Sequence, residues 1–337
     1  MIKKESHFMK GKKILITRNF PDAGIKMLEE QGFCITLWDS KIPMTQPELI
    51  EKAKKHNAVF CTMTEKIDAH FLNECRHLEI ISQFAVGYDN IDISEATRRG
   101  IPVGYTPNAM NQATADIAFG LMIATARKMF YTHNTISKDQ WKTFQPKAFL
   151  GMELMNKTLG IVGMGRIGME MAKRCRGAYD MEILYHNRSP NPVAQERFNA
   201  RLTGFDQLLA KSDIVSVHCA LTPETREMFN RAAFEKMKSS AIFINTARGM
   251  VHNETDLIHA LETGQIWGAG LDVTNPEPMD KDNSLLSMEN VCVLPHIGSA
   301  TVESRNTMSI MAATNIIEFY RNGTMPTVVN PEVLKGL

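Results

Sequence analysis

Short runs of aliphatic and β-branched residues alternate with segments of helical period along most of this chain. In the first hundred or so positions, the runs expected to be strands are 14–17, 34–37, 58–62, 79–83 and 102–104, and the clearest helical patterns are 24–31 and 47–56. Strands that alternate with helices at this spacing predict βαβ units and a parallel sheet.

A second series of the same kind begins at Lys157. Its expected strands are 158–163, 182–186, 214–219, 241–245, 267–271 and 291–294, and its expected helices are 167–176, 205–210, 231–237 and 254–262. This series predicts a second doubly wound sheet.

Three further segments set the domain organisation. One long helix is expected at 109–131, followed by an irregular segment at 137–151, and an amphipathic helix is expected at 302–321. Because the last helix follows the completed second series, we expect it to pack on the first one. The predicted fold is therefore α/β, with two doubly wound parallel-sheet domains. One comprises residues 11–108 plus 302–331, and the other, residues 109–301, is inserted into it.

Composition bears on the partners. The 38 Lys and Arg residues against 37 Asp and Glu leave a formal charge of +1, so we expect a small ligand and neither nucleic acid nor an anionic membrane. The six cysteines contain no C-x-x-C pair, which argues against a metal site or a disulfide framework and favours a reduced, cytoplasmic protein. The N-terminus lacks the apolar core of a signal peptide, and the most apolar stretch, 113–126, is too short to span a membrane.

A glycine motif marks the start of the second series. The sequence G-M-G-R-I-G at 163–168 follows an apolar strand and opens a helix, which is the context that gives a G-x-G-x-x-G motif its meaning. The first glycine allows the tight turn, the second lets the backbone approach a pyrophosphate, and the third lets helix and strand pack closely. We therefore predict a Rossmann dinucleotide-binding domain whose phosphate loop comprises Gly163, Gly165, Arg166, Ile167 and Gly168.

The end of the next strand indicates which dinucleotide is bound. Proteins of this type that use NAD carry Asp or Glu there, about 20 residues on, to accept hydrogen bonds from the ribose 2′-OH. This chain has Asn187, Arg188 and Ser189 instead. A guanidinium pairs with a 2′-phosphate, and amide and hydroxyl groups can donate to it. We expect NADPH, with NADP preferred over NAD.

Three reactive side chains follow strands of the second sheet, on the side where open α/β sheets bind ligands. They are Arg248, Glu277 and His296. Hydride delivery to a ketone leaves negative charge on oxygen, and a histidine is a suitable proton donor near neutral pH. A carboxylate on its far ring nitrogen would orient the ring and favour its charged form. Arg248 suits a carboxylate or a polarised keto oxygen. The sequence thus predicts the reduction of a 2-keto acid.

These motifs resemble those of the D-isomer-specific 2-hydroxyacid dehydrogenases, from about Lys12 to Pro331. The matching segments are 85–92, 160–168, 245–251, 270–278 and 295–301. Within that family the chain is most similar to the glyoxylate/hydroxypyruvate reductases, through Leu271 to Thr274, Pro276 to Pro278, Pro295 to Thr301 and Arg305 to Met308. The resemblance implies a flavodoxin-like substrate domain and NADPH-dependent reduction of glyoxylate to glycolate and of hydroxypyruvate to D-glycerate.

The resemblance also implies residue roles. His296 would be the acid/base, Glu277 its partner, and Arg248 the ligand of the carboxylate and keto groups. The remaining implied contacts fall into two sets: substrate at Met63, Val86 and Gly87, and cofactor at Thr246, Ala247 and Asp272. Met63 stands where many relatives carry leucine. The family commonly forms homodimers through the nucleotide domain, with the segment 141–149 near the partner's cleft.

Two alternatives stay open. Another D-2-hydroxyacid dehydrogenase, of the D-lactate or phosphite type, would share the three reactive residues. A cofactor-sensing dimeric interaction protein on the same fold would bind NADPH tightly with negligible turnover. Rates on a panel of small 2-keto acids distinguish them.

Overall fold

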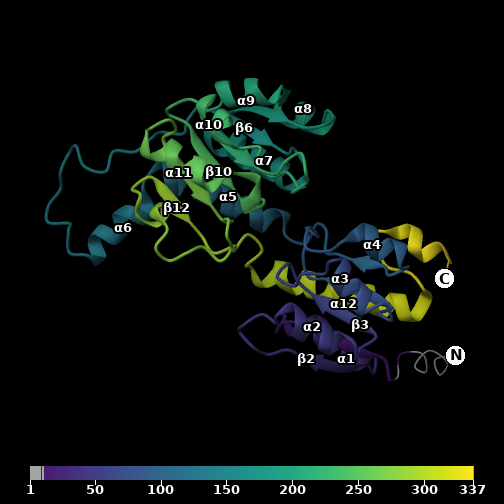
Figure 1. The fold of residues 1–337 in the computed structure, drawn as a ribbon. Helices are drawn as coiled ribbons and strands as arrows, with labels where there is room; N and C mark the ends of the chain where they lie inside the picture. Colours follow the sequence, from purple (N-terminus) through teal and green to yellow (C-terminus); the bar gives the residue numbers. More distant parts are fainter. Residues whose placement is uncertain (1–8, 10, 337) are drawn as a thin grey trace. The chain divides into compact units, whose positions relative to one another are not determined.

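The computed structural model describes residue 9 and residues 11–336. The protein folds as two units, shown as ribbons in Figure 1. Unit 1 consists of the described residues up to Met110 together with those from Thr301, and unit 2 is Asn111–Ala300. Each unit has its own parallel sheet.

The sheet of unit 1 has the strand order β2-β1-β3-β4-β5, which is the flavodoxin-like order of a doubly wound sheet. Its strands are β1 (Lys13–Ile16), β2 (Cys34–Leu37), β3 (Ala58–Cys61), β4 (Ile80–Gln83) and β5 (Val103–Gly104). Its helices are α1 (Asp22–Glu30), α2 (Gln46–Ala53), α3 (Ala69–Glu74), α4 (Ile93–Arg98), α12 (Val302–Asn322) and the 3₁₀ segment η4 (Pro331–Gly336).

Both faces of this sheet are buried, which is why its strands read as continuous apolar runs rather than as an alternating pattern. Successive side chains of a strand point to opposite faces. In β1, Leu15 packs into a cluster with α2 and α3, whereas Ile14 and Ile16 pack into a cluster with α1 and α12. The helices therefore form two layers over one sheet.

Helix α12 packs on unit 1, where it lies against α1. The contact is close because Gly24 has no side chain: a Cβ built there would be 2.2 Å from the backbone oxygen of Ser309. Ser309 also links the helices by hydrogen bonds, since its Oγ accepts from Gly24 N at 3.2 Å and donates to Pro21 O at 2.7 Å. The last helix thus completes the core of the first unit.

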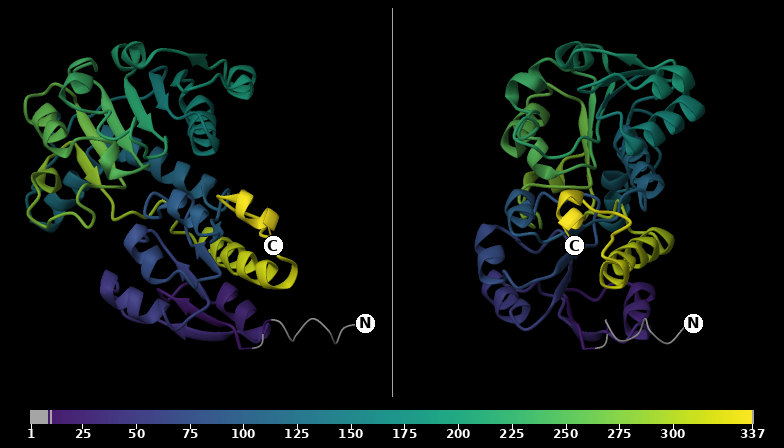
Figure 2. Two further views of the ribbon diagram at one scale, coloured as in Figure 1. Left: turned by 45° about the vertical axis from the view of Figure 1, so that its right-hand side comes forward. Right: turned by 90° about the vertical axis from the view of Figure 1, so that its right-hand side faces the viewer.

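The sheet of unit 2 has the order β12-β11-β10-β9-β6-β7-β8, and all of its pairs are parallel. Its strands are β6 (Thr158–Val162), β7 (Glu182–His186), β8 (Arg201–Leu202), β9 (Ile214–Val217), β10 (Ile242–Asn245), β11 (Gly268–Leu271) and β12 (Val291–Val293). Its helices are α5 (Asn111–Ala126), α6 (Met129–Ser137), α7 (Arg166–Tyr179), α8 (Pro192–Phe198), α9 (Phe205–Lys211), α10 (Arg231–Glu235), α11 (Glu254–Glu262), and the 3₁₀ segments η2 (Gly249–Val251) and η3 (Ser284–Ser287). Helices cover both faces of this sheet as well (Figure 2). The predicted fold class, two doubly wound parallel-sheet domains, is confirmed.

The single helix predicted at 109–131 is wrong. The structure has two helices there, and Lys128 between them adopts a left-handed conformation with φ of +53°. The carbonyl of Ala126 accepts a hydrogen bond from Met152 N at 2.8 Å, so a segment 26 residues away replaces the next turn of the helix. The predicted irregular segment, 137–151, contains no strand and only the last residue of α6.

The described residues contain no helix that combines the length and the apolar character needed to cross a membrane.

Candidate active site

The phosphate loop lies between β6 and α7 with the geometry the glycines require. Gly163 has φ of +99°, and a Cβ there would be 2.6 Å from Cys219 N. A Cβ at Gly168 would be 2.5 Å from Gly163 O, so this position keeps the helix close to the turn. Gly165 is the N-cap of α7, so no side chain of the N-cap residue occupies the first N–H groups of the helix, and a Cβ at this position would meet no atom within 4 Å. The first N–H groups of α7, from Arg166 and Ile167 onward, therefore have room for an anion, which fits a dinucleotide's pyrophosphate.

The three polar residues after β7 have different environments. The amide oxygen of Asn187 accepts from Met164 N at 2.8 Å, so this side chain fixes the phosphate loop and leaves its NH₂ group for other contacts. Arg188 and Ser189 are exposed. The pKa of the nearby Glu224 is lowered by a hydrogen bond from Thr222 and, to a smaller extent, by the charge of Arg188. Asn187 thus serves the loop, and Arg188 has an acidic neighbour.

Thr246 and Ala247 follow β10 and are buried. Thr246 Oγ1 lies 3.4 Å from Nδ1 of His218, whose Nε2 lies 2.9 Å from Ser216 Oγ. Burial lowers the pKa of His218 to about 4, so it is neutral at neutral pH. His218 directly follows β9 and was missed in the sequence, although the same strand-end rule that selected the other polar residues also points to it.

Glu277 and His296 meet in the structure. Nδ1 of His296 lies 2.5 Å from Oε1 of Glu277, which leaves Nε2 as the ring nitrogen for a substrate. The carboxylate accepts a hydrogen bond from Nδ1–H and so orients the ring. The His296 side chain is 20% exposed and that of Glu277 39%. The pair is therefore partly accessible, as an acid/base that exchanges protons with solvent requires.

The backbone of His296 is held in an unusual conformation. Its φ is +53°, in the left-handed region that few residues other than glycine adopt and where strain is common at functional sites. Asp272, which is 1% exposed, holds the turn by accepting from Ile297 N at 2.8 Å and from Gly298 N at 2.7 Å. Burial raises the pKa of Asp272, against the lowering effect of these hydrogen bonds and of His296. Asp272, predicted only to line the cofactor, also fixes the turn that carries His296.

Arg248 lies immediately before η2, in an extended conformation. The side chain of Asn245 fixes its turn: Oδ1 accepts from Ala247 N at 2.9 Å, and Nδ2 donates to Arg248 O at 2.9 Å. The next residue, Gly249, lies against the backbone of Thr274, where a Cβ would be 1.8 Å from the carbonyl oxygen. The turn that carries Arg248 is therefore packed directly against the start of the loop that carries Glu277.

In unit 1, the predicted substrate residues lie on two loops that follow β3 and β4. Asn90 Nδ2 donates to Thr62 O at 3.1 Å and to Glu65 O at 2.8 Å, and Gln83 Nε2 donates to Gly87 O at 2.6 Å. These bonds join the loop of Met63 to the loop of Val86 and Gly87. No hydrogen bond within the described part of unit 1 uses the N–H of Val86 or Gly87, so both are available to an anion.

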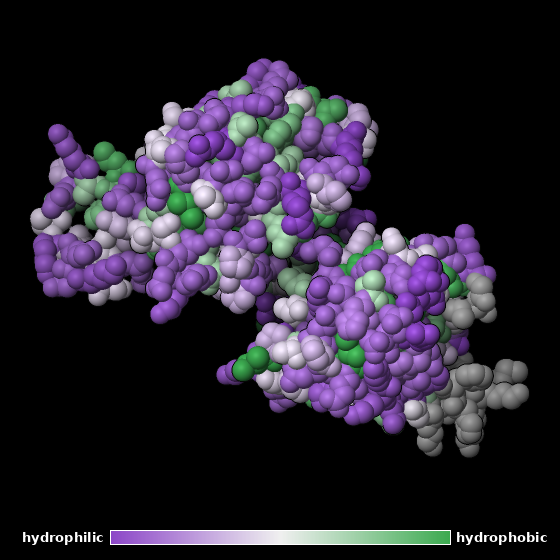
Figure 3. All heavy atoms as spheres, viewed as in Figure 1, coloured by the Kyte–Doolittle hydropathy of each residue, from purple (hydrophilic) through white to green (hydrophobic). Residues whose placement is uncertain are grey.

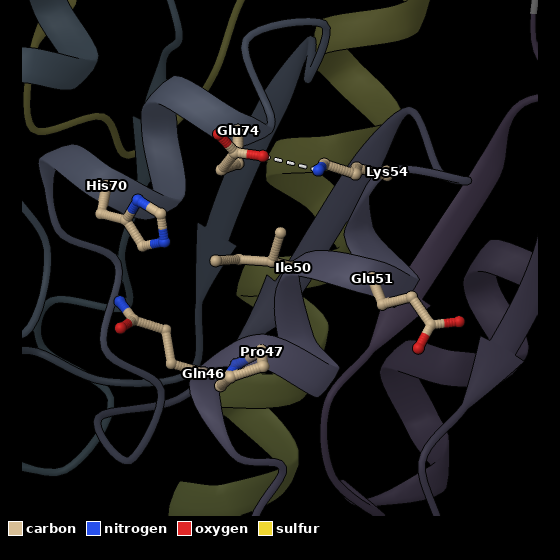
Figure 4. A pocket seen from close by; sticks show the side chains of 7 residues that line it. All are labelled: Gln46, Pro47, Ile50, Glu51, Lys54, His70 and Glu74. Carbon is tan, nitrogen blue, oxygen red and sulfur yellow. Dashed lines mark hydrogen bonds and ion pairs between the residues drawn. The ribbon is translucent and has the colours of Figure 1, made fainter.

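A surface pocket of about 300 Å³ between α2 and α3 contains none of the predicted site residues (Figure 4). It is lined by both helices, with Lys54 and Glu74 paired at 2.6 Å. No group of His, Cys, Asp and Glu that could hold a metal ion occurs in the part of the chain that the structure describes.

Comparison with known proteins agrees with this geometry. A family model described as "D-isomer specific 2-hydroxyacid dehydrogenase, NAD binding domain" matches residues 119–298. The chain is 44% identical over 328 residues to the glyoxylate reductase of Thermococcus litoralis. The alignment covers 96% of this chain and 98% of that protein.

Two crystal structures of relatives are similar along almost the whole chain. The glyoxylate reductase of Paecilomyes thermophila superposes with a TM-score of 0.85 at 32% identity, covering 96% of this chain and 100% of that one. The NADPH-dependent glyoxylate/hydroxypyruvate reductase of Sinorhizobium meliloti, in complex with NADP and malonate, gives a TM-score of 0.80 at 28% identity, covering 94% and 96%. This chain belongs to the D-isomer-specific 2-hydroxyacid dehydrogenase family and is an NAD(P)-dependent oxidoreductase.

Proposed function

We propose that the protein uses NADPH to reduce small 2-keto acids, glyoxylate to glycolate and hydroxypyruvate to D-glycerate. The observation that carries the proposal is the contact of 2.5 Å between Glu277 and Nδ1 of His296, which presents Nε2 as a proton donor. The relatives named for glyoxylate reduction, one of them solved with NADP and the dicarboxylate malonate, support the substrate class.

A bound nicotinamide cofactor supplies the hydride in this reaction. The chain's own part is to hold the substrate and to provide the proton. Arg248 binds the carboxylate and polarises the keto oxygen, since a guanidinium offers two parallel donors. His296 Nε2 donates its proton to the oxygen as negative charge develops there. Glu277 holds Nδ1 and stabilises the protonated ring.

Unit 1 contributes groups suited to a small substrate. The free N–H groups of Val86 and Gly87 are a pair of donors for the carboxylate. Met63 is an unbranched, flexible side chain that covers the substrate's other end. One methylene or hydroxyl group in such a pocket changes discrimination by about 1–3 kcal/mol, so glyoxylate and hydroxypyruvate both remain substrates.

We also propose a homodimer formed through unit 2. Helix α6 and the segment after it extend away from the sheet of this unit (Figure 1), and some hydrophobic residues lie among the hydrophilic ones on this protruding part (Figure 3). Trp141 is 61% exposed, Phe144 82% and Leu150 67%. Large apolar groups exposed together on one segment are typical of an interface. Light scattering should give twice the chain mass for the wild type and the monomer mass for Trp141→Ser/Phe144→Ser; an unchanged mass would contradict this interface.

A reducing, cytoplasmic environment suits the six cysteines, all of which are free.

The decisive experiment measures kcat/KM for glyoxylate, hydroxypyruvate and pyruvate with NADPH and with NADH, and for the oxidation of phosphite with NADP⁺ and with NAD⁺. We expect the highest values for glyoxylate and hydroxypyruvate with NADPH, and their loss in His296→Ala. A preference for pyruvate or phosphite would assign another reaction of the same family. Tight NADPH binding with negligible turnover on all four would replace the enzyme by a cofactor sensor.

A further inference from the structure

The loop that carries Glu277, Asn275 to Asn283, has little packing of its own. Most of its residues are exposed, and Met279 is the member that packs on the hydrophobic core of unit 2. Yet Glu277 has to hold its carboxylate at hydrogen-bond distance from His296. A loop with few apolar contacts opens easily unless polar contacts hold it. The position of Glu277 therefore depends on hydrogen bonds at the loop's ends.

One carboxylate joins both ends of this loop. Oε2 of Glu254 accepts from Asn275 N at 3.1 Å, and Oε1 accepts from Asn283 Nδ2 at 2.6 Å. Glu254 is the first residue of α11, whose N-cap Asn253 accepts from Asp256 N at 3.0 Å. The carboxylate is thus fixed to a helix of unit 2, and hydrogen bonds to a charged acceptor are stronger than neutral ones.

We propose that Glu254 is a positioning residue for Glu277: by bridging Asn275 and Asn283 it holds Glu277 against His296. The inference rests on the proposed role of Glu277 as the partner of the acid/base. In the described part of the chain, the hydrogen bonds of the Glu254 side chain go to Asn275 and Asn283 and not to His296. Its effect passes through the loop.

The amide variant isolates the bridge. Glu254→Gln keeps the side chain's size, but its single carbonyl oxygen can accept from one of the two donors while its NH₂ group faces the other. A loosened Glu277 favours the imidazolium form of His296 less, so the falling limb of the pH profile of kcat/KM should move to lower pH. Because one hydrogen bond of the bridge can remain, we expect a shift in the same direction as that of Glu277→Gln, and smaller than it.

Two further variants test the same link. Asn283→Asp keeps the oxygen that accepts from Leu285 N at 3.0 Å and so retains the cap of η3, but it opposes Glu254 with a second carboxylate. The falling limb of the pH profile of Asn283→Asp should also move to lower pH. Asp256→Asn is the control: Asp256 lies in the same turn as Glu254, and in the described structure its side chain accepts a hydrogen bond from Arg231 N at 2.9 Å rather than from residues 275–283. Its pH profile should match the wild type.

A double-mutant cycle separates this route from a general loss of structure. In the Glu277→Gln background, Glu254→Gln should cause no further shift of the limb, because the group it positions has already lost its charge. Thermal unfolding of each variant, with oxalate binding in the presence of NADPH, monitors folding and the Arg248 site. Both should stay close to their values in the parent protein.

The outcomes are distinguishable. The inference is overturned if the falling limb of the pH profile moves in Glu277→Gln but stays in place in both Glu254→Gln and Asn283→Asp. The proposed function then remains intact. It is also overturned if Glu254→Gln shifts the limb equally in the wild type and in the Glu277→Gln background, or if Asp256→Asn shifts the limb as much as Glu254→Gln does. An unmoved limb in Glu277→Gln itself refutes the role of Glu277, and the inference falls with it.

Discussion

Glu277→Gln should move the pH profile of keto-acid reduction without abolishing the reaction. Glutamine keeps an oxygen that accepts from Nδ1 of His296, so the ring stays oriented, while the negative charge that favours imidazolium is lost. A hydrogen bond between charged groups contributes about 1.5–3 kcal/mol. The side chain of Glu277 is 39% exposed, so solvent screening reduces this toward the value of a surface pair, to about 1 kcal/mol. At pH values above the falling limb, a loss of about 1 kcal/mol corresponds to a decrease of kcat/KM of roughly fivefold.

The sign follows from the direction of the reaction. Reduction consumes the proton on His296, so kcat/KM holds at low pH and falls as the ring loses its proton. Without the Glu277 carboxylate the ring gives up its proton more readily, so the falling limb of the kcat/KM profile moves to lower pH. Initial rates of glyoxylate reduction, followed as NADPH absorbance between about pH 5 and pH 9, measure it across histidine's titration range. His296→Ala is the comparison and should lose activity throughout. A limb that stays in place, or moves to higher pH, refutes the assigned role.

Three further changes have expected outcomes. Arg248→Lys should raise KM for glyoxylate about tenfold or more, because an ammonium cannot form two parallel bonds to a carboxylate, while NADPH binding measured by fluorescence stays unchanged; equal losses of both would contradict it. Gly24→Ala should destabilise the protein by about 1–3 kcal/mol in chemical unfolding, because its Cβ would be 2.2 Å from Ser309 O, whereas Gly120→Ala, which faces open space, should not. Burial lowers the pKa of His252 to about 4 from an ordinary 6.5, so the unfolded state binds the proton first. The free energy of unfolding should therefore fall as the pH drops from about 6.5 to 4. His252→Leu should flatten this fall, and an unchanged slope would contradict the burial argument.

The periodicity of apolar residues along the sequence predicted most of the secondary structure, because both sheets are covered by helices on two faces. Continuous apolar strands and amphipathic helices are then the direct consequence of burial. The helix predicted at 109–131 failed because its break depends on Met152, a residue distant in sequence that takes the carbonyl of Ala126. The short helices α3, α4 and α8 carry little period. Their first turns are fixed by the caps Asp68, Asp92 and Asn191.

The reactive residues were visible in the sequence because each follows a strand at the ligand-binding edge of a parallel sheet. The contact between Glu277 and His296 was predicted from chemistry, and the structure places the two groups at hydrogen-bond distance. The residues that hold them were not visible. Asp272 and Glu254 act on backbone groups 20 or more positions away, and those pairings depend on the path of two loops that no periodicity encodes.

The cofactor preference is the prediction on which sequence and structure bear most differently. The sequence suggested that Asn187 donates to a 2′-phosphate, but the structure shows its oxygen bound to Met164 N, which makes it part of the phosphate loop. In Asn187→Asp one carboxylate oxygen can keep that bond, and the other replaces NH₂ with negative charge that accepts from a ribose 2′-OH and repels a phosphate.

Arg188 then carries the attraction for the 2′-phosphate, in competition with the nearby Glu224. Because Arg188 is exposed, its pairing with phosphate is screened, and Arg188→Ala should lower kcat/KM for NADPH about tenfold while leaving NADH nearly unchanged. Adding Asn187→Asp should lower the NADPH value further and raise the NADH value. Glu224→Gln is the matched control and should slightly favour NADPH. A wild type that prefers NADH, or an Arg188→Ala variant that loses equally with both cofactors, would show that this strand end does not select the 2′-phosphate.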